Sequence, residues 1–326
     1  MIFAARGVIV SLAFFVILYC PLSALVVLGW HCVNRVARKS SPGSANFLCG
    51  LRIFSFALSL AVAVFFAFPS FWFMESASLD EDAATFLLAA CSLLILGAGL
   101  LRLLWAQART ERAVTEWSLA GRSRAGTSEA GTSRAGTSTS SDTAEPALSA
   151  SSGAPALILA GIWKPQVMIS DRARILLSRD ELEILVRHEL GHMRSCDNLK
   201  KALISATPFP GMSRLESAWR EAAEWAADDA AVTNRQDALD LAAALIKLSR
   251  SSSRWSEPRL ASGVVSGSSS IRRRVERLLQ WSANGRRLRR TWVWTLPAVF
   301  TLVVTIAGNY GAILALTHRL TELFVP

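Results

Sequence analysis

The chain has 326 residues, and 52% of them are hydrophobic. Its mean hydropathy of +0.34 is high for an ordinary soluble domain, so membrane segments are expected. The formal net charge is +10, but basic and aromatic residues are not interleaved in the way that favours nucleic acid, so no direct nucleic acid binding is expected.

Four uncharged apolar runs lie along the chain, at residues 8–30, 53–74, 83–101 and 293–317. A helix needs about 20 mostly apolar residues to cross the hydrocarbon core of a bilayer, and all four runs are long enough. They predict a polytopic α-helical membrane protein with four transmembrane helices. For the first run the alternative is a cleaved signal peptide, against which stand its length and the lack of a clear cleavage site.

The charges between the runs predict how the chain is oriented. Lys and Arg gather in 31–52, after 101 and before 291, whereas the loop 75–82 carries only acidic residues. Cytoplasmic loops carry the excess of basic residues, so the N-terminus and the acidic loop are expected outside and residues 106–290 inside. The expected location is the bacterial cytoplasmic (inner) membrane, which the chain crosses several times, with the short tail after the fourth run outside.

These patterns predict five regions. Residues 121–153 repeat the unit AGTS three times and hold little that can be buried, so they predict a flexible linker, with a protease-sensitive site as the alternative function. The predicted regions are a three-helix membrane region at 1–105, the linker at 106–153, a cytosolic domain at 154–290, a fourth transmembrane helix at 291–318 and a short external tail at 319–326.

The sequence of residues 154–290, which are expected inside the cell, predicts a mostly α, α+β domain. "PALILAG" and "PQVMIS" predict a β-hairpin, whose strand near 166–170 is expected at the sheet edge, where an extended substrate backbone could pair with it. Ser178 followed by Glu181 forms a capping-box pattern, so a helix is expected to begin near 179. Further helices are expected at 213–232, 236–250 and 271–281.

The stretch "RHELGHMRSCDN" holds two of the four histidines of the chain. On a helix, His188 and His192 share a face and can both direct a ring nitrogen at one ion, with Glu189 placed to act on a water molecule. This HExxH arrangement predicts two Zn²⁺ ligands and a general base. The alternative is a chance pentapeptide on an ordinary amphipathic helix.

A catalytic zinc site needs a third protein ligand, and the helix 213–232 offers acidic residues at spacings of three and four. We assign Glu224 as the third ligand and Asp228 as the acceptor that orients a ligating histidine. Glu221 is the competing ligand, and a solvated acidic face is the alternative. Gly191 costs helix stability, and a close approach of the second helix would explain it.

Three pieces of sequence carry a family resemblance: "HELGH", "CDN" at 196–198 and "WREAAEWAADDAAV" at 219–232. Together with the lead-in "GIWKPQVMIS…LSRDELEILVRHE", they resemble the membrane-embedded zinc peptidases of the beta-lactam sensor-transducer (BlaR/MecR-like) type. The resemblance implies a cytosolic gluzincin domain between a third and a fourth membrane helix. It implies the same roles for the same residues: metal on His188, His192 and Glu224, base on Glu189 and supporting acid on Asp228.

The sequence also departs from that family. Members that sense beta-lactams carry a penicillin-binding domain after the fourth helix, and this chain is expected to lack it. Ala227 stands where the family usually has Cys, and the AGTS linker has no counterpart that we can place. The expected signal therefore arrives through the membrane helices, the acidic loop or a partner.

We expect a membrane-anchored zinc endopeptidase that cleaves a cytosolic regulatory protein in signal transduction. The resemblance implies that the partner is a transcriptional repressor and leaves open whether self-cleavage comes first; the lipid bilayer is the other partner. Two alternatives stay open: a membrane quality-control or CaaX-type zinc protease, and a catalytically silent, zinc-stabilised membrane sensor. No oxyanion donor is identified, since Tyr19 and Tyr310, the two tyrosines of the chain, lie in membrane runs.

Overall fold

The computed structural model describes most of the chain, in separate stretches: residues 2–34, 44–74, 83–129, 148–150, 157–160, 166–251, 262–263, 268–281 and 305–324. The chain forms two compact units. We call Met1–Leu101, Ala206–Ala218 and Leu288–Pro326 the membrane unit. The second, which we call the site unit, comprises Arg102–Ser205 and Trp219–Arg287.

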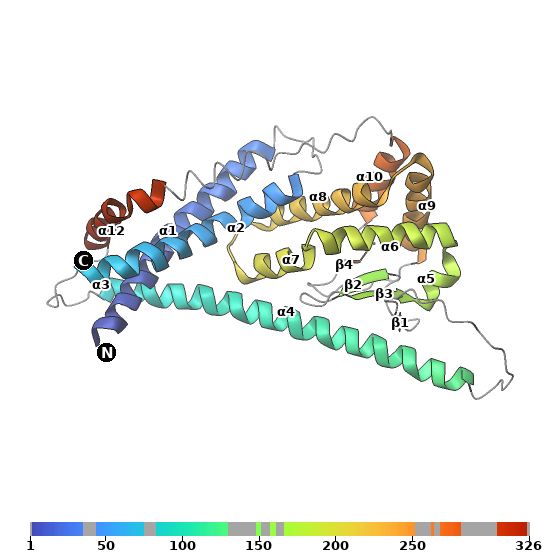
Figure 1. The fold of residues 1–326 in the computed structure, drawn as a ribbon, viewed down its shortest axis with the longest axis horizontal. Helices are drawn as coiled ribbons and strands as arrows, with labels where there is room; N and C mark the ends of the chain where they lie inside the picture. Colours follow the sequence, from blue (N-terminus) through green and yellow to red (C-terminus); the bar gives the residue numbers. More distant parts are fainter. Residues whose placement is uncertain are drawn as a thin grey trace. The chain divides into compact units, whose positions relative to one another are not determined.

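Three helices of the described chain are long and apolar enough to cross a membrane. The first is α1 (Ile2–Asn34), the second is α2 (Ser44–Val62) continued by the π-turn η1 (Ala63–Ala67) and α3 (Phe68–Met74), and the third is the first part of α4 (Ala83–Glu129) (Figure 1). They coincide with the first three predicted runs. The fourth run lies partly outside the described residues, and α12 (Tyr310–Phe324) covers only its end, so this span stays a prediction.

Helix α4 does not end with its membrane run but continues to Glu129, into the segment that was predicted to be a flexible linker. The sequence between 102 and 118 is rich in Arg, Ala, Leu and Glu, which are good helix formers, and it contains no Gly or Pro. Gln107 also donates to Glu111 one turn further on, at 3.0 Å. The linker prediction is therefore wrong for residues 106–129, while 130–147 lie outside the described residues.

A buried arginine on α2 holds the connection between two later helices, α7 (Asp197–Ala206) and α8 (Ser213–Ala231). Only 2% of Arg52 is exposed. Its Nε donates to Glu216 Oε1 at 3.0 Å, its Nη1 to Thr207 Oγ1 at 3.1 Å and its Nη2 to the Thr207 carbonyl at 2.6 Å. A charge within an apolar helix is costly unless it is paired, so this network fixes the α7–α8 connection to the membrane helices.

The site unit contains a four-stranded sheet with the order β1-β3-β2-β4. Strands β2 (Leu157–Ala160) and β3 (Gln166–Ser170) pair antiparallel, as the predicted hairpin requires. However, β1 (Leu148–Ala150) pairs parallel with the other side of β3, and β4 (Ser262–Gly263) pairs with β2. The prediction that β3 is an edge strand is therefore wrong, because a strand from the expected linker covers that edge.

The helices of the site unit begin where local sequence signals place them. Ser170 accepts from Ala173 at the start of α5 (Asp171–Leu176). At the start of α6 (Arg179–Arg194), Ser178 and Glu181 form the predicted capping box, each side chain accepting from the backbone of the other. The predicted later helices are also present as α8, α9 (Arg235–Ser251) and α10 (Ser268–Leu279).

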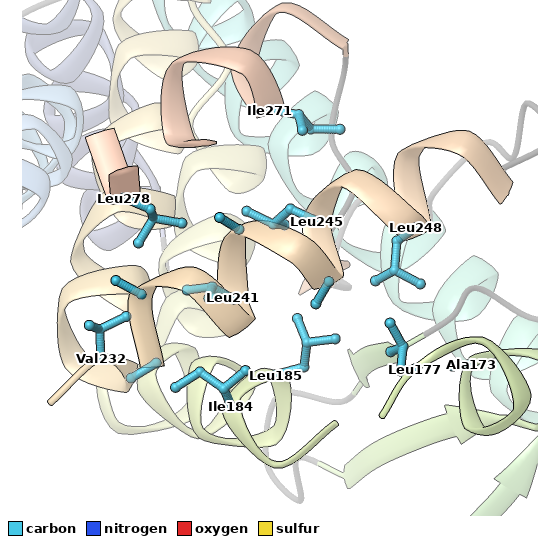
Figure 2. Packing of buried hydrophobic residues seen from close by; sticks show 14 of the residues in the cluster. Ala173, Leu177, Ile184, Leu185, Val232, Leu241, Leu245, Leu248, Ile271 and Leu278 are labelled. Atoms are coloured by element: carbon cyan, nitrogen blue, oxygen red, sulfur yellow. The ribbon is translucent and has the colours of Figure 1, made fainter. Parts of the chain in front are cut away.

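The core of the site unit lies between α6 and α9. Ile184 and Leu185 of α6 pack against a cluster that includes Leu241 and Leu245 of α9 (Figure 2). Burying a side chain of this size contributes about 1.5–3 kcal/mol, so this face fixes how α6 is rotated about its axis. The two histidines one turn further along are thereby oriented without a contribution from a metal.

Gly191 lies where α6 and α8 meet. A Cβ built on it would stand 3.3 Å from Ala227 Cα and 3.4 Å from Ala230 Cβ. A contact of 3.3 Å is tighter than nine in ten real Cβ contacts, so a side chain here would require Ala227 of α8 to give way by a few tenths of an ångström. The expected close approach of the second helix to the metal helix is confirmed.

Candidate metal centre

Three predicted ligands come together between α6 and α8. His188 and His192 are 0% and 2% exposed, and their Nε2 atoms lie 3.2 Å apart. Glu224 reaches them from α8, with Oε2 3.7 Å from His188 Nε2 and Oε1 3.6 Å from His192 Nε2. The three potential ligand atoms all lie within 4.8 Å of one another.

Each histidine ring is oriented by a carboxylate on its far side. His188 Nδ1 lies 3.0 Å from Asp228 Oδ1, and His192 Nδ1 lies 2.7 Å from Asp197 Oδ2. An ionised carboxylate can only accept, so each ring in its neutral form keeps its hydrogen on Nδ1 and presents a lone pair at Nε2. Two lone pairs and a carboxylate then face one point, an arrangement that a divalent cation satisfies.

The acidic side of this site is held by an arginine from α10. Arg274 is 1% exposed. Its Nη1 donates to Glu224 Oε2 at 2.7 Å, and its Nε and Nη2 donate to the two oxygens of Asp228 at 2.8 and 2.6 Å. One guanidinium thus fixes the carboxylate that faces both histidines and the carboxylate that orients His188.

Glu189 is fully buried, and neither of its carboxylate oxygens has a hydrogen-bond partner among the described residues. Burial raises the pKa of this carboxyl, although the two neighbouring histidines oppose that shift. A buried carboxylate without a partner is costly in a folded protein and is typical of functional sites. Its raised pKa favours an exchange of protons with a bound water molecule.

The charges of the site shift two pKa values in opposite directions. Burial lowers the pKa of His188, but its interactions with Asp228 and Glu224 outweigh that effect and raise the pKa to about 9. Burial also acts to raise the pKa of Glu224, but Arg274 and the histidines hold it far below its ordinary range. At neutral pH and without a cation, the site therefore holds an anionic Glu224 and a proton on His188.

The competing ligand is placed elsewhere. Glu221 is not part of the three-residue group and instead pairs with Arg273 Nη1 through Oε1, at 2.6 Å. On α8 it lies three residues before Glu224, about 60° away around the helix axis, so it shares that face but is engaged by α10. The geometry therefore favours Glu224 over Glu221 as a ligand.

Two residues of the site were missed by the sequence reasoning. Asp197 follows the turn after α6, in which Cys196 adopts a positive φ of 54°, and this reversal brings the carboxylate back to His192. Arg274 lies three residues after Ile271 and four before Leu278, and both of these are buried in the core. An arginine within an apolar helical stripe was the signal that could have identified it.

Comparison with known protein families gives a match for residues 123–278, to the model of the BlaR1 peptidase M56. The matched segment includes α6, α8 and most of α10, and with them every side chain described above. Comparison with curated proteins gives no match.

Proposed function

We propose that the chain, whose residues 123–278 match the family model of the BlaR1 peptidase M56, is a membrane-anchored zinc endopeptidase. The observation that carries the proposal is the convergence of His188, His192 and Glu224 beside the unpaired carboxylate of Glu189. This is the donor set of a catalytic zinc site, with three protein ligands and a base that does not bind the metal. A purely structural site has no need of that base.

In this proposal His188, His192 and Glu224 hold Zn²⁺, with Asp228 and Asp197 fixing the rings. Bound there, Zn²⁺ would supply Lewis-acid polarisation of the scissile carbonyl and of a water molecule. Glu189 accepts a proton from that water and later donates it to the departing amine. Its buried position and raised pKa suit both transfers.

The proposed substrate is a cytosolic regulatory protein, similar to a transcriptional repressor, cleaved as a step in signalling. The family match supports signalling over the quality-control alternative. The basic residues at the inner boundaries support a peptidase unit that faces the cytoplasm, and the three apolar helices support anchoring in a membrane. We propose the bacterial inner membrane as its location.

The first experiment is the zinc content of the full chain purified in detergent. We expect about one zinc per chain in the wild type, and little in His192→Ala or Glu224→Ala. Glu221→Ala is the matched control on the same helix and should retain the metal. Zinc that is lost in Glu221→Ala but kept in Glu224→Ala would show that the third ligand is assigned wrongly.

The second experiment tests the reaction. Newly formed protein N-termini are compared between cells that express the wild type and cells that express Glu189→Gln. Fragments of a cytosolic regulator that appear only with the wild type would support the proposal. If the zinc-loaded wild type produced no cleavage beyond that of Glu189→Gln, the proposed peptidase activity would be refuted in favour of a catalytically silent sensor.

A further inference from the structure

The contact between Arg274 and Glu224 has a role that the ligand set alone does not explain. We propose that Arg274 is a positioning residue that makes Glu224 bind the metal through one oxygen, so that a coordination position stays open. The inference rests on the proposed zinc site and assigns it a residue from α10, outside the two helices that carry the ligands.

Without the arginine, the two oxygens of Glu224 are nearly equivalent. Oε2 lies 3.7 Å from His188 Nε2 and Oε1 lies 3.6 Å from His192 Nε2. Carboxylates bind cations through one or both oxygens, so this placement alone permits chelation by both. Chelation would occupy the position that a catalytic site leaves to water and substrate.

Arg274 makes the two oxygens different. Its Nη1 donates to Oε2 at 2.7 Å, so the hydrogen bond from the guanidinium falls on this oxygen of Glu224. The hydrogen bond uses electron density on Oε2, and the positive guanidinium repels a second cation from the same oxygen. Oε1 is thereby left as the oxygen that faces the metal.

The guanidinium is itself held rigidly. Its Nε and Nη2 contact both oxygens of Asp228, at 2.8 and 2.6 Å, and only 1% of the side chain is exposed. Two parallel bonds of this kind fix the plane of the guanidinium, which a lysine ammonium cannot reproduce. Arg274 therefore cannot swing away to release Oε2 while α10 stays in place.

Helix α10 is attached to α8 by further pairs on both sides of this contact. Arg273 pairs with Glu221 at 2.6 Å, and Arg277 pairs with Asp229 at 2.6 Å. By contrast, Arg272 is 83% exposed and pairs with Glu276 of its own helix at 2.8 Å. Arg272 is thus a matched control: it has the same charge, lies in the same helix and pairs with a residue of that helix.

The test replaces zinc with Co²⁺ in the full chain in detergent, because the visible absorption of Co²⁺ reports its coordination number. We expect an intense four-coordinate spectrum for the wild type and for Arg272→Gln. In Arg274→Gln the band should weaken severalfold as Glu224 binds through both oxygens. Arg274→Lys should lie between them, since it restores the charge without the planar fork.

A wild-type spectrum in Arg274→Gln would overturn the inference while leaving the zinc site intact. If Arg274→Gln does not fold, Arg274→Lys decides, and a wild-type spectrum there overturns the inference equally. A wild type that binds neither Co²⁺ nor Zn²⁺ would overturn the proposed function itself. The two failures are therefore distinguishable.

Discussion

His192 Nδ1 lies 2.7 Å from Asp197 Oδ2, although Asp197 belongs to the next helix and is 3% exposed. The same carboxylate accepts from Lys200 at 3.1 Å. His192 and Lys200 together hold the pKa of Asp197 low against the effect of its burial, so it stays anionic. The pair couples the orientation of one metal-facing ring to the turn between α6 and α7.

Asp197→Asn should therefore weaken zinc binding. The amide can still accept from His192, but it no longer carries the charge that holds the imidazole in the right tautomer, so zinc affinity should fall about 10- to 100-fold. Competition with a zinc indicator measures the effect. Asp240→Asn on α9, where Asp240 accepts from Gln236, is the control. Equal losses in the two variants would point to general destabilisation instead.

Glu189→Gln should separate metal binding from chemistry. The amide has the shape of the carboxylate but cannot accept a proton, so the rate of peptide cleavage should fall by about 10²- to 10⁴-fold. Zinc content should not change, since Glu189 is not in the three-residue ligand group. Parallel measurements of zinc content and cleavage rate check both halves, and a variant that keeps full activity contradicts the assignment.

Zinc affinity should rise with pH across the neutral range. The pKa of His188 is raised from 6.5 to about 9 without a metal, so its proton stabilises the metal-free fold below pH 6.5, and this stabilisation is lost as the pH rises through about 9. Zinc has to displace that proton, so its affinity should increase up to about tenfold per pH unit between these values and then level off. Titration at several pH values tests this, and a flat profile would contradict it.

The Arg52–Glu216 pair should behave as a buried ion pair in the membrane unit. Glu216→Leu removes the carboxylate that pairs with Arg52, whose side chain is 2% exposed, and this should cost about 3–5 kcal/mol of unfolding free energy. Adding Arg52→Met should recover much of that loss, because the buried charge is then absent. Thermal unfolding in detergent gives the four free energies of this double-mutant cycle.

The exposed pair Arg272–Glu276 is the control for that cycle. Its two single changes should each have little effect on the free energy of unfolding, and their effects should add. If the Arg52 and Glu216 changes also added, the buried network would not be a coupled unit.

The sequence predicted best what is determined by neighbouring residues. The capping box of Ser178 and Glu181, the β2–β3 hairpin and the four-residue spacing of His188 and His192 are all local patterns. The grouping of the histidines with Glu224 was also accessible, because the chemistry of a zinc site calls for one more ligand and few residues offer it.

The predictions that were wrong or missing concern contacts between segments that are distant in the sequence. Strand β1 pairs with β3 from about 20 residues upstream, and no periodicity in so short a strand indicates such a partner. Arg274 is 46 residues from Asp228 and reaches it only because α10 folds back on α8. The prediction ended α4 too early for a different reason: the AGTS repeat indicated a linker, whereas the helix formers at 102–118 continue the helix beyond the membrane run, and it ends at Glu129.

The closeness of Ala227 to Gly191 means that α6 and α8 approach each other where neither helix carries a large side chain. Side chains can change rotamer when a neighbour moves, but two helix backbones in contact have no such adjustment. The distance between the two histidines and Glu224 is thus held to a fixed tolerance by the smallest residue available. A substitution of this one glycine would keep every proposed ligand and still shift the spacing of the two helices by a few tenths of an ångström.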